Sequence, residues 1–291
     1  MMAQRVCAVI VLFHPSPEMI ENLQNIRKQV DALVAVDNGS TSAELEPVRE
    51  AKDSLNFQLI ENGENLGIAD ALNQGVRWAK SEGYDWVILF DQDSKITNGF
   101  IGQMFATWES HPERGRVGSM HPRYVDPDSG IEPVVRRAND SGPIISLTSG
   151  ALMPLWIFDK IGGFASEFFI DWVDIEFSFR IRAAGFLIAD SRQAVLLHGA
   201  GHPTKLSLFG FTFRPDHHNA ARRYYISRNQ VVVFRKYIRV FPLWIVQSMY
   251  TSLRETTKCF IGEQDRLHKF RNFLLGTWDG LLGRMGRREN L

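Results

Sequence analysis

The stretch that decides the fold is Tyr84-Asp85-Trp86-Val87-Ile88-Leu89-Phe90-Asp91-Gln92-Asp93-Ser94. Its apolar run, 87–90, is continuous rather than alternating, which predicts a strand buried on both faces of a sheet. Asp91 and Asp93 follow at the carboxyl end of that strand, where open α/β sheets bind ligands. If the chain stays extended there, both carboxylates point the same way and can address one divalent cation. A polar turn after a strand is the ordinary alternative.

Strand-like and helix-like segments alternate on the amino-terminal side of this run. We expect strands at 6–13, 32–36 and 57–60, and helices at 18–30, at about 40–53 and at 68–80. Such alternation predicts an α/β fold, with a mostly parallel sheet covered by helices. A polar cluster follows each strand, and we expect these clusters to gather along one edge of the sheet: His14, Asp37, Asn62 with Asn65, and Asp91 with Asp93.

The pattern is looser after residue 100. We expect a helix at 101–110, a strand at 116–124, a polar loop at 125–143 and a strand at 144–153. A helix from Asp171 to residue 184 and short strands at 185–190 and 195–197 complete this part. Gly67, at the start of the helix 68–80, lets a backbone N–H approach an anion such as phosphate. Taken alone, this motif favours the alternative, a plain capped helix start with a small residue for packing.

Charge is distributed unevenly along the 291 residues. Formal net charge is zero, yet residues 1–213 hold 18 Lys and Arg against 27 Asp and Glu, whereas residues 214–291 hold 15 against 6. We therefore expect a body at 1–213 and a basic helical tail at 214–291, in which Trp-bearing apolar faces are flanked by Lys and Arg. Such helices suit the surface of an anionic membrane, and packing on the body or on a second copy of the chain is the alternative.

Composition narrows the class and the compartment. The hydrophobic fraction of 44% and the charged fraction of 23% are those of a globular protein. Only two cysteines occur, Cys7 and Cys259, which excludes a disulfide framework. We recognise no signal peptide, and no segment reaches the roughly 18 apolar residues of a spanning helix. The expected location is the cytoplasm, peripherally at the inner face of the cell membrane, with no nucleic-acid partner.

Three acids, Asp171, Asp174 and Glu176, stand at the start of the helix that ends near residue 184. Capping explains two of them. Apolar neighbours, Trp172 among them, would partly desolvate the carboxylates, which suits general-base catalysis and leaves more than one candidate for the base. His198 follows an apolar run in a glycine-rich loop, where it either completes a metal site or serves as an ordinary loop residue.

Over residues 5–200 the order of these motifs resembles family 2 glycosyltransferases of the GT-A fold. The matching pieces are Phe13-His14-Pro15, Val36-Asp37-Asn38-Gly39-Ser40, Asn65-Leu66-Gly67 through Asn73-Gln74-Gly75, Asp91-Gln92-Asp93, Thr148-Ser149-Gly150, Gly162-Gly163-Phe164, Asp174-Ile175-Glu176 and His198. Within the family, Phe168–Asp174, Arg222–Asn229 and the tail around 279–286 are similar to bacterial rhamnosyltransferases that use dTDP-L-rhamnose for O-antigen or other surface polysaccharide.

The resemblance implies a role for each matching residue. Donor-binding residues would be His14, Pro15, Asp37, Asn65, Gly67, Asp91 and Gln92, with Asp37 on the pyrimidine ring. Asp91, Asp93 and His198 would hold Mg²⁺ or Mn²⁺, and Ser149, Gly150 and Trp172 would lie on the acceptor side. Asp174 would be the general base. His14 stands where Asn is common, and Val173 replaces the first acid of the usual pair, which makes Asp171 the second candidate for the base.

The resemblance thus implies an inverting, metal-dependent transfer of a sugar from a nucleotide-sugar donor to a lipid-linked or oligosaccharide acceptor. Single displacement at the anomeric carbon needs one carboxylate beside the sugar, whereas retention through a covalent intermediate needs a nucleophile as well. L-Rhamnose from dTDP-L-rhamnose is the expected donor sugar, and a UDP-hexose is the alternative. An aspartyl phosphatase is discounted because the first strand ends without an acid. A nucleotide-binding scaffold without catalysis is the alternative that is not an enzyme.

Overall fold

The computed structural model describes residues 4–127, 130, 145–197, 206–208, 211–213, 219–262, 265–289 and 291. The chain divides into two compact units, of which the first comprises Met1–Ser166 with Val173–Gly199. The second comprises Glu167–Trp172 with Ala200–Leu291. The short segment Glu167–Trp172 was not expected in the helical unit, because its local sequence carries no sign of contacts with helices far along the chain. The functional division into 1–213 and 214–291 stays a prediction.

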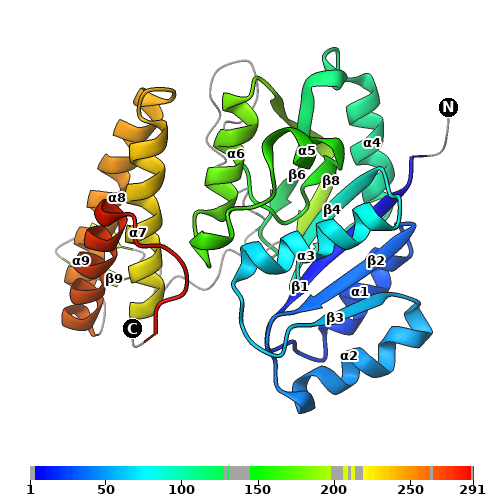
Figure 1. The fold of residues 1–291 in the computed structure, drawn as a ribbon, viewed down its shortest axis with the longest axis horizontal. Coiled ribbons are helices and arrows are strands. Elements are labelled where there is room, and N and C mark those ends of the chain that lie inside the picture. The colour runs from blue at the N-terminus through cyan, green and yellow to red at the C-terminus, as the bar shows by residue number, and fades with distance from the viewer. Residues whose placement is uncertain are drawn as a thin grey trace. The chain divides into compact units, whose positions relative to one another are not determined.

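The first unit is built on an eight-stranded sheet with the order β3-β2-β1-β4-β7-β6-β8-β5 (Figure 1). The strands are β1 (Val6–Leu12), β2 (Ala32–Asp37), β3 (Gln58–Glu61), β4 (Trp86–Asp91), β5 (Lys95–Ile96), β6 (Val117–Val125), β7 (Leu152–Pro154) and β8 (Leu187–Leu197). Strand β7 is antiparallel to β4 and β6, and β5 is antiparallel to β8. The remaining pairs are parallel, which confirms the expected α/β class with a mostly parallel sheet.

Both faces of the sheet are covered by helices, as the continuously apolar strands require. Alternate residues of β1 (Ala8, Ile10 and Leu12) join one buried cluster to which α1 (Met19–Arg27), α2 (Ser42–Leu55) and α4 (Phe100–Ser110) contribute. On the opposite face, Val9 meets Gly75 of α3 (Ile68–Ser81), where an added Cβ would lie 2.2 Å from Val9 Cγ1. Among the described residues, the remaining helices of this unit are α5 (Trp156–Ile161) and α6 (Val173–Ala183), with a short 3-10 turn at Arg114–Arg116. A second 3-10 turn, Ser166–Phe168, begins at the last residue of this unit before the segment Glu167–Trp172.

Three expected elements differ from the structure. The expected strand at 144–153 is wrong apart from β7, because the chain turns at Gly150 (φ 78°). The helix expected from Asp171 begins at Val173, because Asp171 and Trp172 have left-handed φ angles of 62° and 65°. The two short strands expected at 185–197 are one strand, β8, which pairs with β6 along its length across two irregularities.

The second unit consists mainly of α7 (Ala220–Tyr237), α8 (Pro242–Gly262) and α9 (Arg266–Leu282), with a small antiparallel pair, β9 (Leu206–Leu208) and β10 (Phe211–Phe213). Helix α9 packs closely on α7 because Gly276 and Gly280 present no side chain at the contact. A Cβ on Gly276 would lie 2.2 Å from the carbonyl oxygen of Tyr224. Within the described residues, no helix combines the length and the apolar character needed to cross a bilayer.

We predict that Gly75→Ala destabilises the first unit by about 1–3 kcal/mol, because the added methyl overpacks the contact between α3 and β1. Gly102→Ala in α4 is the matched control: it is also a helical glycine, but nothing lies within 4 Å of its added Cβ. There the higher helix propensity of alanine stabilises by up to about 1 kcal/mol. Urea unfolding of both variants measures this, and equal effects of the two substitutions would contradict the packing argument.

Candidate active site

The carboxyl ends of four neighbouring strands lie level in the first unit. Leu12 of β1 lies beside Asp37 of β2, and Val11 lies beside Asp91 of β4. Asp37 is in turn beside Glu61 of β3. Because these strands run parallel, the loops that follow them leave at the same edge of the sheet, where α/β proteins bind ligands. The polar clusters that follow β1 to β4 therefore gather at one edge.

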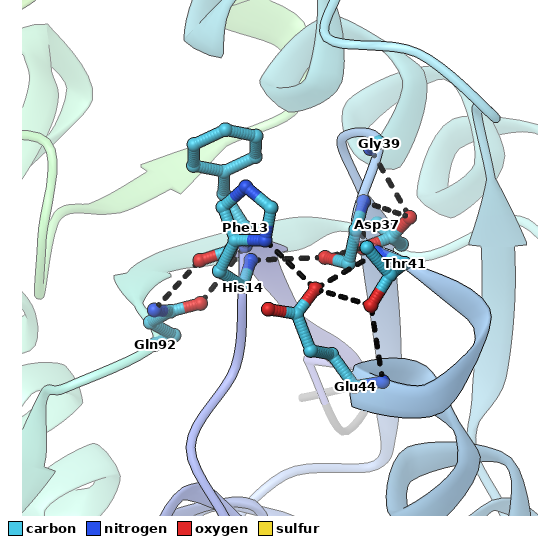
Figure 2. Close-up of polar contacts among 8 residues, drawn as sticks. Phe13, His14, Asp37, Gly39, Thr41, Glu44 and Gln92 are labelled. Carbon is cyan, nitrogen blue, oxygen red and sulfur yellow. Dashed lines mark hydrogen bonds and ion pairs between the residues drawn. The ribbon is translucent and has the colours of Figure 1, made fainter.

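Asp37 shapes the loop that follows β2. Its carboxylate is 2% exposed and accepts hydrogen bonds from Gly39 N (3.1 Å), Ser40 N (3.1 Å) and the hydroxyl of Ser40 (Figure 2). A buried carboxylate is stable only when its oxygens accept such bonds. Asp37 thus holds a tight turn at the site, in addition to the base-binding role that the resemblance implies.

The loop after β3 is joined directly to the loop after β2. Asn38 Nδ2 donates to Asn65 Oδ1 (3.1 Å), and Asn65 Oδ1 also accepts from Gly67 N (2.9 Å). Gly39 (φ 95°) packs so closely that an added Cβ would lie 2.5 Å from the carbonyl carbon of Glu64. The candidate donor residues Asn65 and Gly67 are therefore positioned by the turn that Asp37 holds.

His14 links the loop after β1 to the start of α2. Its φ is 48°, its backbone N–H donates to Ser40 Oγ (2.9 Å), and its Nδ1 lies 2.8 Å from Glu44 Oε2 (Figure 2). The Glu44 carboxylate also accepts a hydrogen bond from the Thr41 hydroxyl (2.7 Å). The hydrogen bonds with His14, first, and with Thr41, second, lower the pKa of Glu44 to about 2. Pro15 is buried and lines a pocket of about 280 Å³ between this loop and α2.

Gln92 joins the loop after β4 to the loop after β1. Its amide accepts from Phe13 N (2.9 Å) and donates to Phe13 O (3.1 Å), as Figure 2 shows. The sequence analysis expected the chain to stay extended through Asp91 and Asp93, but the structure has a turn here instead. Strand β4 ends at Asp91, and Ser94 N donates to Asp91 O (3.1 Å) across a turn. Asp91 is half-buried, whereas Asp93 is exposed on that turn.

The candidate metal ligands lie on this turn and beyond it. Asp91 and Asp93 belong to the site edge, whereas His198 falls outside the described residues. In the part of the chain that the structure describes, no three His, Cys, Asp or Glu side chains form a cluster able to hold a metal. Mg²⁺ and similar hard cations commonly use only one or two protein carboxylates, together with substrate phosphates and water. The donor set of Asp91 and Asp93 fits that type of ion.

The candidate acceptor-side residues Ser149 and Gly150 pack against the end of β4. Ser149 is 1% exposed, and its Oγ lies 2.5 Å from Ser94 Oγ and 3.4 Å from Asp91 N. Gly150 N donates to Leu89 O (2.6 Å). A Cβ on Gly150 would lie 2.7 Å from Pro122 Cγ, so glycine is required. Both residues therefore support the turn that carries Asp91 and Asp93.

The three acids near α6 have different surroundings. In the second unit, Arg222 binds the Asp171 carboxylate bidentately, with N–O distances of 2.9 to 3.1 Å. In the first unit, Glu176 is 1% exposed and pairs with Arg180 (2.8 Å).

Asp174 is half-buried and lines a small cavity. Its carboxylate accepts a hydrogen bond from Ile175 N (2.8 Å). The other residues that line the cavity include Ser119, His121, Ser146 and Ser178. Burial lowers the pKa of His121 to about 3, so this cavity is lined by a neutral imidazole.

Two asparagines with structural contacts, Asn73 and Asn22, were not predicted from the sequence as site residues. Asn73 of α3 donates to Phe164 O (2.8 Å) and accepts from Phe164 N (2.8 Å). Gly163 passes so near that an added Cβ would lie 2.5 Å from Asn73 Oδ1. Asn22 of α1 donates to Gln92 O (3.2 Å). In the sequence, Asn73 lies in the motif that ends at Gly75. That motif was interpreted as the start of a helix, and nothing in it predicted the hydrogen bonds between Asn73 and Phe164.

The comparisons with known proteins agree with this architecture. The model of glycosyl transferase family 2 matches residues 7–153. A dTDP-rhamnosyl transferase, RfbF, of Shigella flexneri is 26% identical over 98% of each chain. An N-acetylglucosaminyl-diphospho-decaprenol L-rhamnosyltransferase of Mycobacterium tuberculosis is 25% identical over 67% of this chain and 76% of its own.

A solved structure supports the same fold. The mannosyltransferase PcManGT from Pyrobaculum calidifontis, in complex with GDP-Man and Mn²⁺, superposes with a TM-score of 0.62. The superposition covers 97% of this chain and 89% of the other. Because the two sequences are only 18% identical, the match supports the GT-A fold and no more specific property. The family match spans the strands and loops that form the site edge. The chain therefore belongs to glycosyl transferase family 2 and is a glycosyltransferase.

Proposed function

We propose that this enzyme transfers L-rhamnose from dTDP-L-rhamnose to a hydroxyl of a lipid-linked saccharide during synthesis of a bacterial surface polysaccharide such as O-antigen. The observation that carries the proposal is the likeness to a dTDP-rhamnosyl transferase over 98% of both chains, which includes the helical tail as well as the site. The second relative, named for a saccharide on decaprenol diphosphate, supports a lipid-linked acceptor. A UDP-hexose donor is the alternative.

The donor side of the proposed site is formed by the joined loops after β1, β2 and β3. Asp37 and Asn65, with Gly67 at the start of α3, receive the nucleotide. Gly67 leaves its helix terminus open to close approach, and the positive end of the helix dipole favours the diphosphate there. His14 and Pro15 in the loop after β1, joined through Phe13 to Gln92 in the loop after β4, complete the same edge. Because hydrogen bonds join these loops before the donor arrives, little ordering is left to oppose binding.

Asp91 and Asp93, with His198 as a further candidate, would hold Mg²⁺ or Mn²⁺ on the turn after β4. When bound, such an ion supplies Lewis-acid stabilisation of the charge on the departing diphosphate. Ser149 and Gly150 keep the turn in place through Ser94 and Leu89. The chain thus provides two carboxylates on a supported turn, which suits an ion shared with the donor.

We assign the general base to Asp174. This residue is half-buried beside a cavity, so its carboxylate is partly desolvated. Asp171 and Glu176 are each ion-paired with an arginine, Arg222 and Arg180 respectively, and both carboxylates have a structural use in those pairs. In the proposed reaction Asp174 takes the proton of the acceptor hydroxyl while that oxygen attacks the anomeric carbon. One displacement of this kind inverts the configuration.

We expect dTDP-L-rhamnose to bind more tightly than UDP-hexoses or GDP-mannose in calorimetry, and only with Mg²⁺ or Mn²⁺ present. EDTA should abolish transfer, and excess Mn²⁺ should restore it, because the diphosphate and the carboxylates repel one another without the ion. Asp93→Asn should weaken donor binding in Mn²⁺, because a ligand of the ion is lost, and should not weaken it further in EDTA, where no ion is held. Full transfer activity in chelator would refute the metal role, and tighter binding of a UDP-hexose would refute the rhamnose assignment.

Asp174→Asn should lower kcat by roughly 10²–10⁴-fold, the usual contribution of a general base, and leave donor affinity within about twofold. Asp159→Asn is the matched control, since Asp159 is an exposed acid of the same unit that pairs with Lys80 away from the site edge. Steady-state kinetics and donor calorimetry measure both. Unchanged kcat in Asp174→Asn would remove Asp174 from the reaction.

The second unit presents an apolar face that suits the surface of an anionic membrane. On α8, Leu243 is 80% exposed and Leu253 is 68% exposed, and on α9, Leu267 is 83% exposed and Trp278 is 58% exposed. The tail, residues 214–291, carries 15 Lys and Arg against 6 Asp and Glu, so it is positively charged. Positive charge and exposed apolar side chains both favour contact with an anionic lipid surface. We propose peripheral association through these helices, and contact between two copies of the chain is the alternative.

In a density gradient, full-length protein should float together with vesicles that contain anionic lipid. With neutral vesicles it should remain in the bottom fraction, unbound. Leu243→Glu combined with Leu267→Glu should abolish flotation, because both apolar side chains would be replaced by charges of the same sign as the lipid. Trp156→Glu, at an exposed apolar residue of the first unit (38%), is the matched control and should float like wild type. If the double variant floats normally, the tail has no membrane role. A shift from dimer to monomer without a change in flotation would support contact between copies.

A further inference from the structure

The segment Glu167–Trp172 has a strained backbone. Phe169, Asp171 and Trp172 have φ angles of 63°, 62° and 65°, in the left-handed region. None of the three is glycine, and bulky side chains are disfavoured there. Residues of this kind persist where their surroundings hold them, and they are frequent at functional sites.

Two buried side chains of α7 hold this backbone within the second unit. Asn229 Nδ2 lies 3.0, 2.8 and 2.8 Å from the carbonyl oxygens of Phe168, Ile170 and Asp171. Arg228 Nη2 donates to Phe168 O (3.0 Å), and Arg228 Nε donates to Asn229 Oδ1 (2.9 Å). The bond from Arg228 fixes the orientation of the Asn229 amide, so that its NH₂ group faces the segment. Both side chains are 0% exposed.

The side chains of the segment are held by the same unit. Arg222 binds Asp171 bidentately. The ring of Phe169 stacks on Tyr225 with centroids 5.0 Å apart, and Trp172 meets Phe234 edge to face at 5.6 Å. Side chains of α7 therefore contact both the backbone and the side chains of Glu167–Trp172.

The chain on either side of the segment is held by the first unit. Ser166 Oγ donates to Asp70 Oδ1 (2.6 Å) and accepts from Asn73 Nδ2 (3.2 Å). After Trp172 the chain enters α6 at Val173, and Asp174 is the next residue. The segment thus belongs to the second unit and lies directly before the start of α6, the helix of the first unit that carries the proposed base.

A simple connection between two units would not need this arrangement. Burying the guanidinium of Arg228 is unfavourable unless its donors are satisfied, and here they are used on the carbonyls of Glu167, Phe168 and Gly286. Three left-handed residues add further cost. A relaxed or glycine-containing linker would connect the units without either. The strained residues lie directly before Asp174 in the sequence, and the buried cation of Arg228 binds the backbone of the same stretch. Together they indicate that the conformation of this stretch matters for the reaction.

We propose that Arg228 and Asn229 are positioning residues for sugar transfer, which act through the backbone of Glu167–Trp172 to set the start of α6 and the carboxylate of Asp174. The proposal rests on the proposed function of Asp174 as the base. It makes turnover depend on the helical unit, whereas donor binding depends on the loops of the first unit. A small displacement of a reacting group can reduce a reaction rate about 10²-fold. We therefore expect loss of the Arg228 or Asn229 contacts to lower kcat and to leave donor affinity unchanged.

The test compares full-length Asn229→Leu with Tyr224→Phe. Asn229→Leu keeps the approximate volume and removes the donors to the three carbonyls, whereas Tyr224→Phe removes another buried hydrogen bond of α7, to Asp279 (2.7 Å), and leaves the segment alone. We expect Asn229→Leu to lower kcat at least tenfold with donor Kd within twofold, and to speed amide hydrogen exchange at 168–172. Tyr224→Phe should keep both kcat and exchange at that segment, even if its Tm falls equally.

If Asn229→Leu does not fold, Arg222→Gln replaces it, since Arg222 is 45% exposed in its side chain and its loss is tolerated more easily. Faster exchange at 168–172 with unchanged kcat overturns the proposal, and so does an equal loss of kcat in Tyr224→Phe. A parallel loss of donor affinity also overturns it, because the effect would then be a general loss of structure. Absence of transfer by the wild-type enzyme with any donor would overturn the proposed function itself, which separates the two failures.

Discussion

The parallel pairing of β1 with β2 and β4 is the constraint on which the site depends. Its register places Leu12 beside Asp37 and Val11 beside Asp91, so polar loops from distant parts of the sequence leave the sheet at one level. The strands stay in this register because their residues are buried on both faces, by α1, α2 and α4 on one side and α3 on the other. A slip by one residue would exchange the two faces of every strand.

Many polar residues at this edge have a structural use that precedes any ligand. Asp37 closes its own turn, Gln92 joins two loops, and Ser149 supports the turn after β4. Such preorganisation matters for a transferase, because a donor diphosphate and an acceptor hydroxyl must meet in one geometry. Groups that hold the loops are therefore adjacent to the residues proposed to bind substrate, and motif matching alone does not separate the two roles.

The second unit combines a buried polar interior with an exposed apolar surface. Arg228 and Asn229 are buried within it, whereas Leu243 and Leu267 are largely exposed. This is the reverse of the usual distribution, in which charged groups are rarely buried and large apolar patches are covered. The buried polar side chains bind the backbone of the stretch before Asp174, and the exposed apolar ones are those proposed above to contact a membrane.

The sequence by itself determined the α/β class, the first four strands and the position of polar clusters at their carboxyl ends, because buried parallel strands and their turns are encoded by local patterns. It also identified Asp91, Asp93 and the acids near α6 as candidates. Only the tertiary structure decided that Asp171 is bound by Arg222, that Glu176 pairs with Arg180 inside a buried helix face, and that Gln92 joins two loops. Most of these contacts link residues that are distant in sequence, and their energies depend on burial and geometry. No local pattern reports either.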